Sequence, residues 1–202
     1  MVVLDMLLEQ GVEVVGLLDP DESKHGKNFL GVPVLGDDDT ILKFSPDQID
    51  VVNGIGSVKS LQLHKDIYCR IKGKGFFFRN IIHQSAVVSS HASLGEGVQV
   101  MAGAIVCAEV SLGNNVIVNT RASISCESQI GDHVHIAPGA IVSGGVFVGE
   151  ETHIGTGSII LQNLHVGRKA LLGAGAVAVR DLKENCVYVG IPAREASRLH
   201  ET

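Results

Sequence analysis

Two histidines, a cysteine and a glutamate lie within one short stretch, NTRASISCESQIGDHVHIAPGA, which covers residues 119 to 140. The candidate reactive side chains in it are Cys126, Glu127 and His135. A histidine has an unperturbed pKa of about 6.5, so it exchanges protons at neutral pH, and a carboxylate can orient it. A thiol is a poor general base but becomes a nucleophile when a base activates it. The stretch is therefore a candidate catalytic site.

The same stretch belongs to a strict repeat that starts near residue 82. Glycines recur every eighteen residues, at Gly95, Gly113, Gly131, Gly149 and Gly167. Aliphatic residues recur every six positions and glycines every eighteen, which predicts three short strands per coil. Each aliphatic side chain should then point inward and stack on its equivalent in the next coil. The sequence therefore predicts a parallel β-helix, in which the glycines occupy corners that need permissive φ values or lack room. The aliphatic positions, spaced by six residues, are Ile82, Val88, Leu94, Val100, Val106, Leu112, Val118, Ile124, Ile130, Ile136, Val142, Val148, Ile154, Ile160, Val166 and Leu172.

The period also places the reactive residues relative to one another. His153 follows His135 by eighteen residues, so it is expected directly above it, about 4.8 Å away. Cys126 precedes His135 by nine residues, which is half a coil. The two residues then lie on different sides of a triangular prism and would meet most easily across a subunit interface. The spacing therefore favours an active site shared between protomers of an oligomer.

Residues 1–80 have a different character and are expected to form a small α/β domain with a parallel sheet. The predicted strands are VEVVGLLD (12–19), IDVVNGIG (49–56) and FFFRNII (76–82), and the predicted helices are DDTILKF (38–44) and the segment 57–75. The β-helix is assigned to residues 81–180. Residues 181–202 are predicted to add a strand, CVYVG, and a short helical tail that caps the open end.

Composition excludes several classes of protein. The net charge is −6 and no basic stripe is present, which argues against a nucleic-acid surface. No apolar run of membrane-spanning length and no signal peptide is present, so we expect a cytoplasmic protein without a membrane partner. Four scattered cysteines, Cys69, Cys107, Cys126 and Cys186, form no CxxC pair. A disulfide framework or structural zinc site is therefore not expected, and the thiols should be reduced.

The hexads, together with HIAPGA, GGV, LGAGAV and VGIPAR, resemble the left-handed β-helix acyltransferases. With the α/β segment, nearly the whole chain resembles the branch of sialic acid O-acetyltransferases and nucleotide-amino-sugar N-acetyltransferases. The resemblance implies a left-handed β-helix, a Rossmann-like N-terminal domain that holds a sugar or nucleotide sugar, and a homotrimer with acetyl-CoA in the groove between neighbouring helices. It implies acetyl transfer to an amino or hydroxyl group of a bacterial surface sugar.

In this family the base is a histidine followed by an acidic residue, in a stretch resembling NTGAxVxHDCxIGDxVHIAPGA. Asn119 matches its first position and is a candidate substrate contact, and Glu127 fills the acidic position. The base histidine, however, falls on Cys126. Three readings follow: an inert replacement with much reduced activity, activity through another base, for which His135 is the best candidate, or a covalent acetyl-cysteine at Cys126.

The resemblance also suggests binding residues for the cofactor and the sugar. For acetyl-CoA these are the glycines and the C-terminal residues Gly144, Gly155, Gly173, Ala174, Arg180, Pro192 and Arg194, where the arginines supply charge. For the sugar or its nucleotide they are residues that follow the first two predicted strands, namely Asp19, Asp21, Gly54 and Gly56.

The start of the chain departs from the family pattern. Family members open with a strand and a Gly-rich GAGGH-type loop, whereas Met1 is followed at once by VVLDMLLEQ, which resembles the rest of the first helix. We therefore expect the first strand and that loop to be missing, which weakens the case for nucleotide-sugar binding. Two alternatives remain: a catalytically silent trimer that binds CoA or sugar, and a zinc-dependent β-helix carbonic anhydrase that uses stacked histidines, although no metal is expected.

Overall fold

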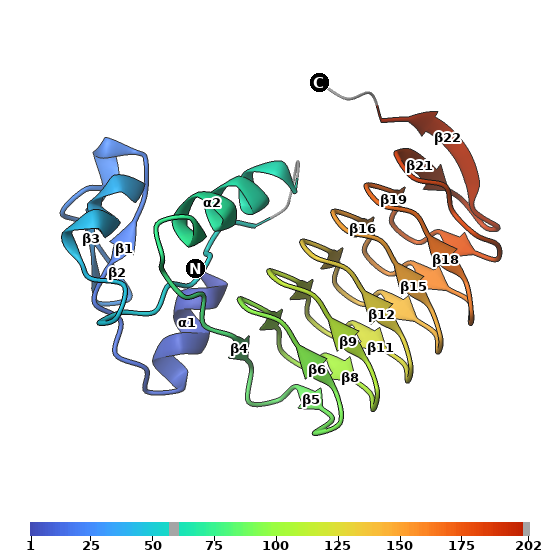
Figure 1. The fold of residues 1–202 in the computed structure, drawn as a ribbon, viewed down its shortest axis with the longest axis horizontal. Helices are drawn as coiled ribbons and strands as arrows, with labels where there is room; N and C mark the ends of the chain where they lie inside the picture. Colours follow the sequence, from blue (N-terminus) through green and yellow to red (C-terminus); the bar gives the residue numbers. More distant parts are fainter. Residues whose placement is uncertain (57–60, 200–202) are drawn as a thin grey trace.

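The computed structural model describes residues 1–56 and 61–199, which form a small α/β unit followed by a long β-helix (Figure 1). Strands of the α/β unit form one sheet in the order β1-β3-β2, with β1 parallel and β2 antiparallel to β3. The predicted fold class, a small α/β part followed by a parallel β-helix, is confirmed. The elements of the α/β unit are α1 (Val2–Glu9), β1 (Leu17–Leu18), η1 (Glu22–Lys24), β2 (Asn28–Phe29), β3 (Val32–Gly36), η2 (Asp38–Lys43) and α2 (Gln62–Lys72), where η marks a 3-10 helix.

Within the α/β unit, the strands differ from the prediction. Only Leu17 and Leu18 of the predicted strand 12–19 join the sheet. Val12 and Val14 instead pack against apolar side chains of α1 and the β-helix, which partly buries them without a strand partner. The parallel sheet expected from 49–56 and 76–82 is reduced to an isolated bridge between Val51 and Phe78, and the β2–β3 hairpin was not predicted.

The two predicted helices of this unit are present in part. The segment 38–44 forms the 3-10 helix η2, and the segment 57–75 contains α2. Residues 57–60 of the second prediction lie outside the described residues.

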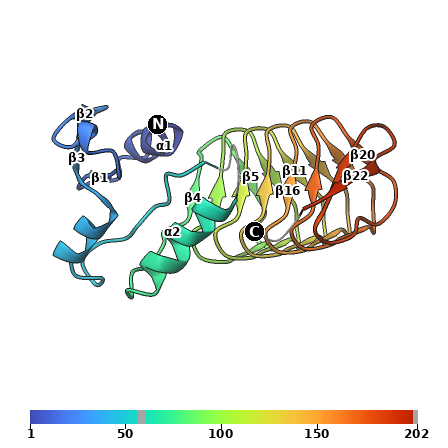
Figure 2. The ribbon, with the colours of Figure 1, turned by 90° about the horizontal axis from the view of Figure 1, so that it is seen from above.

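Three parallel sheets form the three faces of the β-helix, and the coils stack along the long axis of the molecule (Figure 2). The first face contains β4 (Ile81–Ile82), β7 (Gln99–Val100), β10 (Ile117–Val118), β13 (His135–Ile136), β16 (His153–Ile154) and β19 (Leu171–Leu172). The second face contains β5 (Val87–Val88), β8 (Ile105–Val106), β11 (Ser123–Ile124), β14 (Ile141–Val142), β17 (Ile159–Ile160) and β20 (Val177–Ala178). The third face contains β6 (Ser93–Leu94), β9 (Ser111–Leu112), β12 (Gln129–Ile130), β15 (Phe147–Val148) and β18 (His165–Val166).

Each strand pairs with the strand eighteen residues later, in the register that the repeat predicts. Ile117 pairs with His135, and His135 pairs with His153. The second residue of each strand points inward, and along most of the β-helix it is fully buried, as are Ile136 and Ile154. The first residue of each strand points outward, so the outer surface of each face is set by one residue per coil.

The corners between the faces explain the glycines. A Cβ added at Gly149 would lie 2.6 Å from the backbone nitrogen of Arg168 in the next coil, so this corner has no room for a side chain. Another corner position has positive φ at every sixth residue from Gly97 to Gly175. Residues other than glycine also adopt this left-handed conformation, among them Glu127 with φ of 63° and His133 with φ of 59°.

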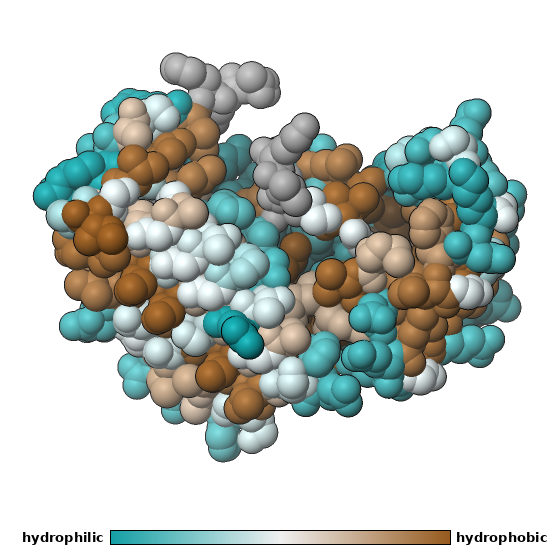
Figure 3. Space-filling view, turned by 180° about the vertical axis from the view of Figure 1, so that it is seen from behind, coloured by the Kyte–Doolittle hydropathy of each residue, from teal (hydrophilic) through white to brown (hydrophobic). Residues whose placement is uncertain are grey.

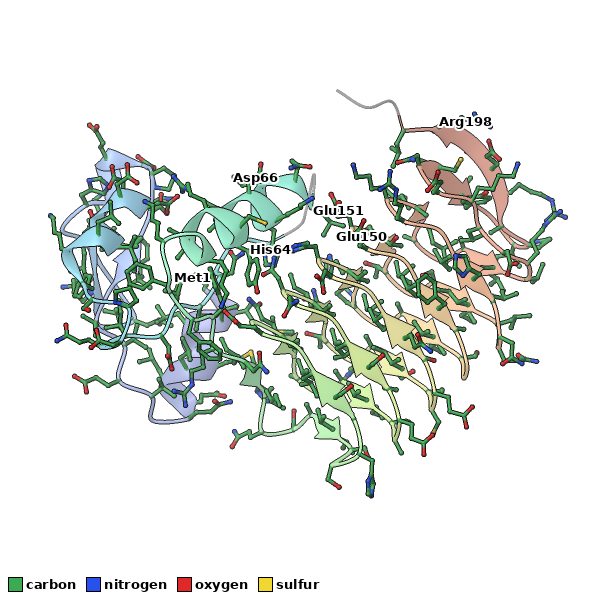
Figure 4. All side chains as sticks on the ribbon, in the orientation of Figure 1. Met1, His64, Asp66, Glu150, Glu151 and Arg198 are labelled. Carbon is green, nitrogen blue, oxygen red and sulfur yellow. The ribbon has the colours of Figure 1, made fainter. Side chains whose placement is uncertain are left out.

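The α/β unit packs on the first face of the β-helix at its N-terminal end. Met6 and Leu7 of α1 form one buried cluster with Ile81, Met101 and Ile117. Polar contacts also join the α/β unit to the β-helix. The Gln99 side-chain amide donates to the carbonyl of Asn53 at 2.6 Å. Lys65 of α2 pairs with Glu151 at 2.9 Å, and Figure 4 shows Glu151 on the edge of the coils beside α2.

At the opposite end, β21 (Cys186–Val189) extends the first face and pairs in parallel with β19. The predicted strand CVYVG is therefore present. The predicted helical tail is wrong for Arg194–Arg198, which form β22, antiparallel to β21. The free edge of β21 offers unpaired backbone groups, and pairing with them outweighs the helix preference of this short segment. Residues 200–202 lie outside the described residues.

Candidate active site

His135 and His153 stack on the first face, as the repeat predicts. Their ring centroids are 4.9 Å apart and the rings meet edge to face at 77°. The Asn119 side-chain amide lies 3.0 Å from Nε2 of His135. Because Asn119 Oδ1 accepts from the Thr120 amide at 2.7 Å, its NH₂ group faces the histidine and donates to it. Nε2 of His135 is therefore an acceptor, which places the proton of the neutral ring on Nδ1.

Burial controls the charge of this histidine pair. The pKa of His135 is lowered to about 3, mainly by burial and also by the nearby rings of His153 and His64. Burial also lowers the pKa of His153. His135 therefore stays neutral at physiological pH and is a much weaker base than an exposed histidine.

Cys126 and Glu127 lie at the corner that follows β11, between the second and third faces, and both are exposed. The carbonyl of Cys126 accepts from the Gly145 amide at 2.9 Å, and the Glu127 amide donates to Ala108 at 3.3 Å. These bonds hold the corner between the coils below and above it. His135 lies on the first face, so a single chain does not bring Cys126 and His135 together.

The remaining sequence-predicted residues of the β-helix fall on the same two corners. Asn119, Gly155 and Gly173 share the corner between the first and second faces, because they are spaced by multiples of eighteen residues. Gly144 lies one coil above Cys126 on the other corner. A Cβ added at Gly144 would lie 3.2 Å from the carbonyl oxygen of Cys126, and one at Gly155 would lie 2.7 Å from the Ala174 amide nitrogen. These glycines therefore have a structural role in coil stacking whatever ligand they meet.

A shallow hollow of about 570 Å³ opens on the corner that carries Asn119. Ser85, Gly103, Thr120, Arg121, Pro138 and Gly139 line it. Thr120 is the residue next to Asn119, so the hollow adjoins the hydrogen bond between Asn119 and His135.

The C-terminal candidates lie farther along the β-helix. Arg180 follows β20 and is exposed, as are Ala174 and Pro192. Pro192 follows a cis peptide bond in the loop between β21 and β22, and Arg194 begins β22. Nη1 of Arg194 donates to the Ala193 carbonyl at 3.2 Å, which leaves the rest of the exposed guanidinium available for an anion.

In the α/β unit, the structure gives the two predicted aspartates local partners. Asp19 accepts from Lys24 Nζ at 2.8 Å and from the Asp21 amide at 3.0 Å, which lowers its pKa. Asp21 caps η1 through the Ser23 amide at 3.0 Å, and hydrogen bonds from Ser23 lower its pKa. Gly54 and Gly56 are exposed, and among the described residues no atom beyond the two chain neighbours lies within 4 Å of a Cβ built on Gly54. The two aspartates therefore have local partners and the two glycines are open to solvent, and a role of these four residues in ligand binding stays a prediction.

A cluster that was not predicted from the sequence joins α2 to the first face. His64 of α2 is almost fully buried, and its Nδ1 lies 2.7 Å from the Ile55 carbonyl. Asn115, also fully buried, donates to Nδ1 of His133 at 3.0 Å, and the His133 ring meets Tyr68 edge to face. Burial lowers the pKa of both histidines. The repeat places Asn115 and His133 on adjacent coils, but only the packing of α2 brings His64 and Tyr68 to them, and no sequence spacing signals that packing.

The described residues do not support a metal centre. Among residues 1–56 and 61–199, no group of three or more His, Cys, Asp or Glu side chains could hold a metal ion. The stacked pair of His135 and His153 therefore has no third His, Cys, Asp or Glu ligand from the described residues of its own chain. In the same ranges, no helix is long and apolar enough to cross a bilayer.

Comparisons with known proteins agree with this arrangement. The model of the PglD N-terminal domain family matches residues 1–66. The acetyltransferase domain of PglB from Neisseria gonorrhoeae, solved with acetyl coenzyme A, is 34% identical with a TM-score of 0.89, and the match covers 96% of this chain and 93% of that chain. PerB from Caulobacter crescentus, solved with CoA and GDP-perosamine, is also 34% identical with a TM-score of 0.89, over 97% of this chain and 91% of that chain.

A third structure, WeeI from Acinetobacter baumannii, is 22% identical with a TM-score of 0.85, over 96% of this chain and 93% of that chain, and shows a shared fold. A comparison with curated proteins gives no match. The matches to PglB and PerB nonetheless span both the α/β unit and the β-helix at 34% identity. The chain therefore belongs to the PglD-like hexapeptide-repeat acetyltransferases and is an acetyltransferase.

Proposed function

We propose that this acetyltransferase moves the acetyl group of acetyl-CoA to the amino group of a nucleotide-linked sugar, in an active site shared between protomers of a homotrimer. The ligands in the structures of PglB and PerB support this donor and this class of acceptor. The observation that carries the proposal is the placement of the candidate site residues on the two corners that flank the second face of the β-helix.

The second face is the most apolar outer surface of the β-helix. Its outward residues include Val87, Ile105 and Ile141, which are 63%, 43% and 42% exposed. Leu161 and Val179 add further exposed apolar surface beside it. Hydrophobic patches are visible over the β-helix half of the molecule when it is viewed from behind (Figure 3). Among the outward residues of this face only Ser123 interrupts the apolar row, and an exposed apolar row of this kind is typical of a surface that is covered by another chain.

A closed three-fold arrangement would cover these faces and complete the site. When second faces turn toward a common axis, the corner with Cys126 and Glu127 of one protomer meets the corner with Asn119 of the next. His135, which is hydrogen-bonded to Asn119, lies beside the same corner. The arrangement brings together the catalytic candidates that one chain holds apart.

The groove between neighbouring protomers would hold acetyl-CoA along the same corners. Gly144, Gly155 and Gly173 expose backbone groups on the walls of this groove, and Ala174 continues it toward the C-terminal end. Arg180 and Arg194, with Pro192 between them in the chain, would contact the phosphates of CoA, because guanidinium groups pair well with phosphate oxygens. The acetyl group would then lie near the corner with Asn119 and Cys126.

The α/β unit would hold the nucleotide part of the acceptor. The carboxylates of Asp19 and Asp21 stay ionised at neutral pH because their hydrogen bonds lower the pKa of each. They can accept hydrogen bonds from a ribose or a base, and exposed Gly54 and Gly56 leave room for the ligand to approach the backbone.

The cysteine at the base position would make this enzyme slow. The acceptor amine must lose a proton as it attacks the thioester carbonyl, and a protonated thiol takes up that proton poorly. His135 is neutral but only weakly basic, since burial lowers its pKa to about 3. We therefore assign Cys126, Glu127 and His135 to the transfer site, and we expect positioning of the two substrates to supply most of the rate.

Three measurements on the same preparation test this proposal. Light scattering should give the mass of a trimer, calorimetry should detect CoA binding, and GDP- or UDP-linked amino sugars should be acetylated slowly from acetyl-CoA. A monomer, or a protein that does not bind CoA, would overturn the proposal. CoA binding without any transfer to these sugars would favour the silent alternative.

A further inference from the structure

Two cysteines lie on adjoining coils at the corner that carries Cys126. Strands β8 and β11 pair in register, with Val106 opposite Ile124. The Cys107 amide donates to the Ile124 carbonyl at 3.0 Å, and one residue past the cysteine, the Glu127 amide donates to the Ala108 carbonyl at 3.3 Å. The chain segments around Cys107 and Cys126 therefore run side by side.

This register sets the separation of the two cysteines. Cys107 lies opposite Ser125, so Cys126 is its diagonal neighbour one residue farther along. A strand spacing of about 4.8 Å and a rise of about 3.3 Å place the two Cα atoms about 6 Å apart. A disulfide bridges Cα atoms that are about 4.4–6.8 Å apart, so the backbone of this corner accepts one without a large movement.

The surroundings leave Cys126 open and Cys107 sheltered. Cys126 is exposed, while Cys107 is partly buried against the core of the β-helix. The residues one coil below and one coil above Cys126 are Ala108 and Gly144, so no large side chain of its own corner shields the thiol. Burial, together with the neighbouring Cys126 thiol, raises the pKa of Cys107. Cys107 therefore ionises less readily than an exposed thiol and is less accessible, so Cys126 is the one that reacts first.

We propose that Cys126 and Cys107 form a thiol–disulfide exchange site that accepts CoA disulfide. The CoA part of this inference rests on the proposed function, because it places the thiol end of CoA beside Cys126. The Cys126 thiolate attacks one sulfur of CoA disulfide, forming a Cys126–CoA mixed disulfide and releasing one CoA thiol. The Cys107 thiolate then attacks Cys126 sulfur, which forms the Cys107–Cys126 disulfide and releases the second CoA thiol.

The electrons balance across these two steps. Two protein thiols lose two hydrogen atoms, and CoA disulfide is reduced to two CoA thiols. The reverse reaction, with an excess of a small thiol, restores both cysteines. This thiol pair therefore makes the transfer site sensitive to the ratio of CoA disulfide to CoA, because one of its members, Cys126, stands at the family's base position.

Intact-mass spectrometry of the full chain under non-reducing conditions tests the exchange, with CoA disulfide and oxidised glutathione as parallel oxidants. CoA disulfide should convert the protein to a form that lacks two hydrogen atoms, and peptide mapping should place the bond between Cys107 and Cys126. Cys107→Ser should stop at an adduct of one CoA on Cys126. Cys126→Ser should give neither product, and Cys69→Ser, which changes an exposed cysteine on α2, should behave as the unmodified protein.

The two oxidants separate the thiol pair from CoA recognition. Recognition of the nucleotide part should make the reaction with CoA disulfide about tenfold faster than with oxidised glutathione. Equal rates would overturn the CoA part of this inference, and calorimetry of the reduced protein with CoA would then show separately whether the proposed CoA groove fails as well. No Cys107–Cys126 bond with either oxidant, or equal labelling of Cys69, would overturn the thiol pair. Thermal melting of each variant checks that it is folded.

Discussion

His153 lies one coil above His135 on the first face, and their imidazole rings meet edge to face with centroids 4.9 Å apart. Two protonated rings at this distance would repel each other. The fold keeps both neutral, because burial lowers the pKa of each, for His135 to about 3. Protonation of this pair is therefore linked to the stability of the coils that hold it.

The first prediction is that stability falls as the pH is lowered from about 6.5 toward 3. In the unfolded chain these histidines take up protons near pH 6.5, whereas in the folded chain they do so only at lower pH. The unfolded state thus binds more protons in this window, so acid favours unfolding by up to a few kcal/mol. Thermal unfolding at fixed protein concentration between pH 7.5 and 4, in steps of about half a unit, would measure the effect.

Two matched variants show whether the buried histidine pair causes this pH dependence of stability. His135→Asn removes one buried titrating group and should flatten the dependence, while His91→Asn changes a histidine on an exposed turn and should leave it unchanged. An equal slope for His135→Asn and the unmodified protein would show that the stacked pair does not control acid stability.

The β-helix could be predicted almost residue by residue, because each hexad uses the same local geometry. Inward positions such as Ile136, the stacking of His153 on His135, and the crowded corner at Gly149 follow directly from the repeat. One corner feature was missed. The sequence gives little sign that residues such as Glu127 adopt positive φ, because glycine is used at only some of the equivalent positions.

The α/β unit and the junction could not be predicted in the same way. Val12 and Val14 have the composition of a strand but are instead partly buried against α1 and the β-helix. Arg194–Arg198 have the composition of a helix but pair with the free edge of β21. His64 contacts the coils near Asn115 and His133 only because α2 docks on them, a long-range contact that no local pattern encodes.

The second prediction concerns the crowded corner. Gly149→Ala should lower the free energy of unfolding by about 1–3 kcal/mol, because the new Cβ would lie 2.6 Å from the Arg168 amide nitrogen and force the next coil to shift. Gly54→Ala is the control, since a new Cβ there would meet no atom within 4 Å among the described residues other than its chain neighbours, and it should change stability by less than about 0.5 kcal/mol. Chemical denaturation measures both, and equal effects would contradict the crowding argument.

The third prediction concerns the second face. Ile141→Lys places a charge in the middle of the apolar row that we assign to the trimer interface, so it should shift the protein from trimer to monomer. Gln129→Lys makes a similar change on the third face, where the outward residue is already polar and exposed, and should leave the assembly intact. Light scattering at several protein concentrations distinguishes the two. A monomer from Gln129→Lys, with an intact trimer from Ile141→Lys, would place the interface on the third face instead.

The fourth prediction concerns the residue at the base position. Cys126→His introduces an imidazole at an exposed corner, where its pKa should stay close to about 6.5. A positioned general base typically contributes about 10²–10⁴-fold in rate, so kcat for acetyl transfer should rise by up to that factor. KM for acetyl-CoA should change little, because the variant adds a proton acceptor and no new contact with the nucleotide.

The pH profile separates a new base from a general improvement in folding. With Cys126→His, kcat should rise between pH 5.5 and 7.5, as the imidazole loses its proton, and then level off. Adding Glu127→Gln should reduce that gain, because the neighbouring carboxylate orients the histidine and stabilises its protonated form. Cys69→His is the control on α2 and should leave both kcat and its pH profile unchanged. An unchanged or lower kcat for Cys126→His would mean that the corner with Cys126 does not reach the acceptor amine, and the assignment of the shared site would then have to move to His135.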